Sequence, residues 1–126
     1  MSPWNAFSPL VPLTPDEVRH HWRRLHGGDG EPLPASQALL QAWTLYHRGD
    51  FEQAHTAGLA LAEHGESGGL TVSTRALCVY ANYLEPRSDR RWQLFEQAQA
   101  QATRHTEWQP DDPNAWYLLA RSEEHT

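Results

Sequence analysis

One segment near the end of the chain constrains the fold more than any other. Residues 110–120 read PDDPNAWYLLA, so two prolines flank a pair of aspartates and an apolar run follows. Proline cannot continue a helix but is favoured in its first turn, and Asp and Asn are good helix caps. The segment therefore predicts the end of one helix, a short turn and the start of the next. Two earlier segments share these features, so we expect a series of helical hairpins.

Stop signals and apolar spacing divide the rest of the chain into further helices. Thr14, Pro15 and Glu17 form the pattern of a capping box, and Gly27 with Gly28 predicts the end of that helix. Further helices are predicted over 35–48, 51–64, 71–85 and 90–107, with a flexible connection at 67–69. No segment alternates with a period of two, so the predicted fold class is all-α with no β-sheet. The residues expected to face inward are Val18, Trp22, Leu25, Leu39, Ala42, Trp43, Tyr46, Phe51, Ala54, Leu59, Ala62, Leu77, Tyr80, Ala81, Leu84, Trp92, Phe95, Ala98 and Ala102.

Composition excludes several classes of partner. The chain of 126 residues has the length of one domain and a net charge of −6, and all ten of its cations are Arg. Since no basic face can form, we expect no nucleic-acid binding. No segment approaches the roughly 20 consecutive apolar residues of a membrane helix, so we expect a cytoplasmic protein without membrane contact. The absence of Lys is typical of proteins from GC-rich bacterial genomes.

The two ends differ from the helical domain predicted over 14–120. Residues 1–13 are apolar and rich in proline, which predicts an extended arm lying on the body of the protein. Residues 121–126 read RSEEHT, which is also one translation of a widely used sequencing adapter. We therefore expect these six residues to be adapter read-through and the helical domain to be incomplete at its C-terminal end. The alternative interpretation is an ordinary polar helix end.

The segment at 49–54 resembles the central turn of a tetratricopeptide (TPR) repeat. It reads GDFEQA, and residues 95–98 repeat its second half as FEQA. Alanines recur every 39 residues, at positions 42, 81 and 120, whereas the usual repeat has 34 residues. Residues 35–120 thus resemble a divergent, lengthened version of this bacterial repeat family, with Gly58 where an aromatic residue is usual. The resemblance implies a TPR-like α-solenoid of stacked antiparallel hairpins, with Trp116 packed between hairpins.

The resemblance also implies a binding surface, because the first helix of each TPR hairpin lines a concave groove. We expect the side chains at the matching positions to contact a peptide or partner helix; they are Leu39, Trp43, Tyr46, Cys78, Asn82 and Tyr117. For Trp43 and Tyr46 the alternative is packing against neighbouring helices. The function implied is a protein-interaction scaffold that is not an enzyme. Two alternatives are the N-terminal helical part of a larger enzyme or regulator, with its active site beyond residue 120, and a self-assembling module.

No motif points to catalysis, a cofactor or a metal. Eight histidines are present, but His20 and His21 are adjacent and so lie on different faces of a helix. No His-x-x-x-His or Cys-x-x-Cys spacing occurs. Cys78, the single cysteine, lies in an apolar run and is expected to be a buried small side chain. We therefore expect no catalytic, cofactor-binding or metal-binding residue.

Overall fold

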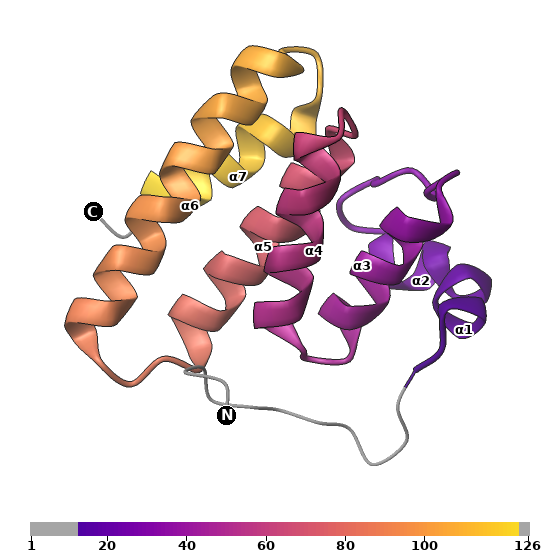
Figure 1. Ribbon diagram of the computed structural model, residues 1–126, viewed down its shortest axis with the longest axis horizontal. Coiled ribbons are helices and arrows are strands. Elements are labelled where there is room, and N and C mark those ends of the chain that lie inside the picture. Colours follow the sequence, from indigo (N-terminus) through magenta and orange to yellow (C-terminus); the bar gives the residue numbers. More distant parts are fainter. Residues whose placement is uncertain (1–12, 124–126) are drawn as a thin grey trace.

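The computed structural model describes residues 13–123, and within this range it contains helices and no strand. The all-α prediction is confirmed. The predicted arm lies outside the described residues except for Leu13, as do residues 124–126, whereas residues 121–123 form the end of the last helix. The helices are α1 (Pro15–His20), α2 (Trp22–His26), α3 (Gln37–His47), α4 (Phe51–Glu63), α5 (Gly68–Tyr83), α6 (Ser88–Trp108) and α7 (Pro113–Glu123) (Figure 1).

Local capping explains where several of these helices begin and end. The Thr14 hydroxyl accepts a hydrogen bond from the Glu17 amide at 3.2 Å, and the Glu17 carboxylate accepts one from the Thr14 amide, so the predicted capping box starts α1. The Ser36 hydroxyl caps α3 by accepting from the Leu39 amide. Gly49 and Gly65 follow α3 and α4 with φ of 83° and 94°, which glycine adopts without strain.

Two predicted boundaries were wrong. The first helix is interrupted at His21, which leaves the helical conformation and lets α2 turn so that Trp22 and His26 are buried. The connection predicted as flexible is instead helical, because Gly68 and Gly69 form the first turn of α5. Gly69 lies directly against Gly58 of α4, and this close approach of two backbones holds the start of α5 in place.

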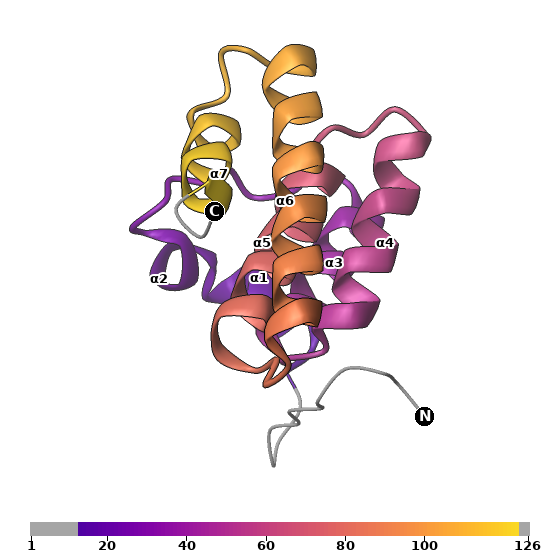
Figure 2. The same cartoon turned by 90° about the vertical axis from the view of Figure 1, so that its left-hand side faces the viewer.

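The helices pack in chain order. From α3 to α7 each helix contacts the next, and α3 also contacts α5, which in turn contacts α7. Within residues 13–123, the backbones of α4 and α6 stay apart, and a side-chain hydrogen bond of 3.2 Å between His55 and Gln97 joins the two helices. The helices α3, α5 and α7 therefore form one layer, which we call the odd-helix layer, and α4 and α6 pack against it (Figures 1 and 2). No described helix is both long enough and apolar enough to span a bilayer.

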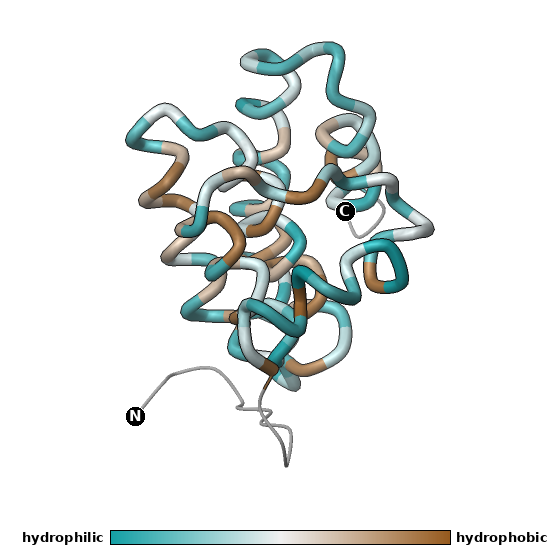
Figure 3. The backbone as a smooth tube through the Cα atoms, turned by 90° about the vertical axis from the view of Figure 1, so that its right-hand side faces the viewer, coloured by the Kyte–Doolittle hydropathy of each residue, from teal (hydrophilic) through white to brown (hydrophobic). Residues whose placement is uncertain are grey.

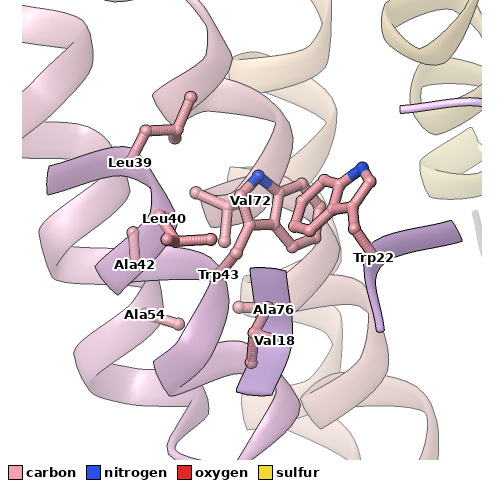
Figure 4. Packing of buried hydrophobic residues seen from close by; sticks show 9 residues of the cluster. All are labelled: Val18, Trp22, Leu39, Leu40, Ala42, Trp43, Ala54, Val72 and Ala76. Atoms are coloured by element: carbon pink, nitrogen blue, oxygen red, sulfur yellow. The ribbon is translucent and has the colours of Figure 1, made fainter. Parts of the chain in front are cut away.

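The largest buried side chain is Trp43 of α3, which anchors the first of two core clusters. Trp22 and Val18 pack against it from the N-terminal helices, and Val72 and Ala76 from α5 (Figure 4). The second cluster lies between α5 and α6 and contains Leu77, Cys78, Tyr80, Ala81, Leu94, Phe95 and Ala98. Apolar stretches recur along the helices, while much of the remaining trace is hydrophilic (Figure 3). Most of the residues predicted to face inward are buried or partly buried.

Three aromatic or aliphatic residues predicted to lie inside are on the surface instead. Leu25, Trp92 and Trp116 are 36%, 46% and 51% exposed. The turn at His21 moves Leu25 outward, and α6 buries Leu94 in place of Trp92. Trp116 lies beside its own turn, where its indole N–H donates to the Pro110 carbonyl at 2.7 Å. It therefore does not fill the space between hairpins, and its replacement by Ala creates no core cavity.

Candidate functional site

A segment outside the repeat region crosses the odd-helix layer. It comprises α2 and the connection to residue 34, and we call residues 22–34 the strap. A polar side-chain contact joins the strap to each helix of the layer: His26 meets His47 of α3, Asp29 meets Arg75 of α5, and Glu31 meets Asn114 of α7. In Figure 2 the part of the strap that follows α2 passes beside α7. These contacts, each between residues far apart in the chain, make the strap and the layer the candidate site.

The first contact joins two imidazole rings. His26 Nε2 and His47 Nε2 lie 2.8 Å apart, so one proton must lie between them. His26 Nδ1 lies 3.1 Å from the Asp29 carboxylate, which accepts the proton of that nitrogen. Neutral His26 therefore accepts at Nε2, and His47 donates. The ring of His26 is stacked on Trp22 at 3.9 Å between centroids and meets Trp43 edge-on, which holds it against the core.

The second contact is an ion pair. An Arg75 N–H donates to Asp29 Oδ2, and the other carboxylate oxygen of Asp29 accepts from the Glu31 amide at 2.8 Å. The Arg75 guanidinium lies 5.5 Å from the Trp43 ring centroid and 5.2 Å from that of Tyr46. Because both aromatic faces attract a cation, Arg75 is held in a fixed position beneath the strap.

The third contact ties the strap to α7. Asn114 donates to Glu31 Oε2 at 2.6 Å, and the Glu31 carbonyl accepts from the Trp22 indole N–H at 2.7 Å. Gly30 has a φ of 67°, which turns the chain so that Glu31 can reach α7. The strap thus closes on itself through Trp22 and onto α7 through Glu31.

Burial and neighbouring charges shift the pKa values of the histidine pair downward. Burial lowers the pKa of His26 below its ordinary value, although Asp29 acts in the opposite direction. For His47, burial and the adjacent His26 and Arg75 lower the pKa to about 4. Both pKa values thus lie below the ordinary value of 6.5, so both rings are neutral near pH 7.

The two strap carboxylates have opposite pKa shifts. Burial acts to raise the pKa of Asp29, but the Glu31 amide, His26 and Arg75 together lower it below its usual range. Burial raises the pKa of Glu31 to about 7; Asp112 and Asp29 add to this rise, and the hydrogen bond from Asn114 opposes it. Of the two strap carboxylates, Asp29 is therefore ionised near neutral pH, whereas Glu31 titrates there.

Two adjoining cavities lie on the odd-helix layer next to the strap. One has a volume of about 470 Å³ and is lined by Asp29, Arg75, Asn114, Tyr117 and other residues. The second, of about 190 Å³, is lined by Tyr46, Arg75, Tyr117 and Arg121 among others. Arg75, Tyr117 and Leu118 line both cavities, which therefore adjoin along α5 and α7, and we call the two cavities together the hollow.

The six residues predicted to line a groove have different positions in the structure. Leu39, Trp43 and Cys78 are buried, with exposed fractions of 9%, 0% and 1%, so these side chains are not available to a partner. The burial of Trp43 corresponds to the alternative expected from the sequence, in which its side chain packs against neighbouring helices. Tyr46 and Asn82 are partly buried, and Tyr117 is 56% exposed. Tyr46 and Tyr117 line the hollow together, whereas Asn82 lies in a separate cavity beside Trp92.

The buried position of Cys78 gives a testable prediction. Burial raises the pKa of its thiol to about 11, so the reactive thiolate is scarce at neutral pH. We expect Ellman's reagent at pH 8 to modify Cys78 at least tenfold more slowly in the folded protein than in 6 M guanidinium. The same reagent with a Cys78→Ser protein gives the background. Equal rates in folded and unfolded protein would show that the thiol is accessible.

The histidines and acidic residues do not assemble into a recognisable metal site. Among residues 13–123, no group of three or more His, Cys, Asp or Glu side chains is arranged to hold a metal ion. His20 and His21 are exposed at the junction of α1 and α2, with their rings edge to face.

The residues that join the strap to the layer were not predicted from the sequence. His26, Asp29, Glu31, Arg75 and Asn114 belong to no recognisable motif, and the resemblance to TPR repeats begins only after the strap. A signal was present in the three glycines at 27, 28 and 30, which mark a connection in which Gly30 adopts a positive φ. Comparison of the chain with protein-family models, with curated proteins and with solved structures found no match.

Proposed function

We propose that this chain is a TPR-like protein-interaction module with no chemistry of its own. Its odd-helix layer would correspond to the concave face of a solenoid and would hold a peptide or a partner helix. The packing of consecutive helices, and the additional contacts of α5 with α3 and α7, support a solenoid arrangement.

The observation that carries the proposal is the hollow that the two adjoining cavities form along α5 and α7. An exposed aromatic residue, Tyr117, stands beside a partly exposed cation, Arg75, and both line the two cavities. Aromatic and Arg side chains in a hollow are the groups that most often dominate binding energy at protein interfaces. Leu118 supplies an apolar floor to the same hollow.

A random-peptide phage library panned against the purified chain tests this function. We expect peptides to be enriched, and a fluorescein-labelled synthetic copy to bind at least tenfold more weakly to Tyr117→Ala than to the unaltered chain. Trp92→Ala is the matched control, since it removes a half-exposed aromatic from α6 outside the hollow. Its affinity for the peptide is expected to stay within twofold of the unaltered value.

Two results would contradict the proposal. The first is that no peptide is enriched over a library panned on an unrelated helical protein. The second is that the selected peptide loses affinity for Trp92→Ala and not for Tyr117→Ala, which would place binding on another face.

A further inference from the structure

The connection that ends the strap covers the odd-helix layer and is held there mainly by polar contacts. Trp22 and His26 are buried, but most of the residues from 27 to 34 are exposed, Leu33 by 49%. This part of the strap therefore buries little apolar surface, and its position depends on Asp29 and Glu31. A segment held by a few polar side chains is easily displaced compared with one packed into a core.

The strap also occupies groups that line the proposed binding face. Asp29 pairs with Arg75 at the wall of the larger cavity, and Asn114, the partner of Glu31, lines the same cavity. A peptide in this cavity would meet an arginine and an amide that are already engaged. Binding of the peptide and closure of the strap therefore compete.

We propose that residues 27–34 are an autoinhibitory cover of the odd-helix layer, and that ionisation of Glu31 releases it. This inference rests on the proposed function, because it describes how access to that binding face is regulated. The contact that opens first is the hydrogen bond between Glu31 and Asn114, because the carboxyl group of Glu31 changes its charge near neutral pH.

The surroundings of Glu31 explain why its ionisation loosens the strap. Asp112 and Asn114 face it from the start of α7, Asp29 from the strap itself, and Arg75 from α5. Arg75 is engaged by Asp29, and His105 of α6 lies 3.3 Å from Asp112 rather than next to Glu31. A neutral Glu31 accepts the hydrogen bond from Asn114 without repulsion. An ionised Glu31 faces two carboxylates in a partly buried place.

The linkage between proton binding and closure of the strap gives the expected size of the pH effect. The pKa of Glu31 is raised from 4.5 to about 7 in the closed strap, so the closed form binds a proton more tightly than an open form with an ordinary carboxyl group. Closure is thus fully favoured below pH 4.5 and is weakened as the pH rises through 7. Between pH 6 and pH 8 the ratio of open to closed strap is expected to rise by about tenfold.

The indole N–H of Trp22 reports closure directly, since it donates to the Glu31 carbonyl at 2.7 Å. Trp116 makes an equally short indole bond to Pro110 outside the strap and serves as an internal reference. In the full chain with ¹⁵N-labelled tryptophan, we expect hydrogen-exchange protection of Trp22 relative to Trp116 to fall about tenfold from pH 6 to pH 8. In Glu31→Gln, which is neutral at both values, the ratio should not change. Asp112→Asn, which removes one facing carboxylate, should reduce the fall.

The labelled peptide from the library provides the second measurement. We expect it to bind the unaltered chain about tenfold more tightly at pH 8 than at pH 6, and Glu31→Gln equally at both. A constant Trp22 ratio, or the same fall in Glu31→Gln, would overturn release by Glu31 whatever the peptide does. A changing Trp22 ratio with equal peptide affinity at both pH values would overturn autoinhibition and leave the binding function standing. Absence of peptide binding at either pH, with a changing Trp22 ratio, would overturn the binding function and with it the inhibitory role.

Discussion

Trp43→Ala is expected to lower the free energy of unfolding by about 3–5 kcal/mol, the largest effect of any single truncation in this fold. Trp43 is fully buried and contacts Trp22, His26 and Tyr46 edge to face. It also lies under Arg75, so its loss removes the support of the guanidinium that holds Asp29. Urea denaturation followed by far-ultraviolet circular dichroism measures the change.

Trp92→Ala is the matched control for this truncation. Trp92 is the same residue type on α6, but it is 46% exposed. We expect its replacement to cost no more than about 1 kcal/mol, because surface substitutions away from special features have small effects. Equal losses in the two variants would contradict the placement of Trp43 at the centre of the first core cluster.

Gly58→Ala is expected to lower the free energy of unfolding by about 1–3 kcal/mol, although alanine is the better helix former. A Cβ at position 58 would come within 2.9 Å of side-chain atoms of Val72 and Ser73, and closer still to the Gly69 carbonyl. The Gly69 oxygen belongs to the backbone of α5 and cannot rotate away. The two helices must therefore separate, which opens the tightest crossing in the fold. Thermal and urea unfolding measure the loss.

Gly28→Ala tests whether the effect comes from the crossing rather than from glycine itself. A Cβ at position 28 meets no atom within 4 Å, and its φ is not positive. We expect a change within about 0.5 kcal/mol of zero. If Gly58→Ala were as harmless as Gly28→Ala, α4 and α5 could not be packed as closely as described.

Local signals predicted most of the fold. The capping box at Thr14, the turn at Gly49 and the junction at Pro113 place helix ends correctly, because caps and turns depend on neighbouring residues alone. The start of α5 was missed because it depends on Gly58, which is distant in sequence. Trp92 was expected inside from the apolar spacing of its helix, and Trp116 from the resemblance to TPR repeats. The exposed fraction of each side chain depends on which face of its helix the neighbouring helices cover.

The residues of the candidate site were harder to predict from the sequence than the helices were. Tyr117, one of the residues predicted to line a groove, is exposed, but Leu39, Trp43 and Cys78, which were predicted to line it too, are buried in the two core clusters. The contacts of the strap join residues 21, 46 and 83 positions apart. Apolar periodicity carries no information about such pairs, since each consists of polar residues on different elements.

The contact between Glu31 and Asn114 also affects how the chain unfolds as a whole. In a linear stack of hairpins each unit touches only its neighbours, so the ends fray independently and unfolding spreads from them. Here the connection after α2 is joined to the last described helix, and α7 cannot detach without breaking a bond to residue 31. Fraying at either end is therefore coupled to the other. The described helices are therefore expected to unfold more cooperatively than they would without this bond, at the cost of a long loop that must form before the last helix is secured.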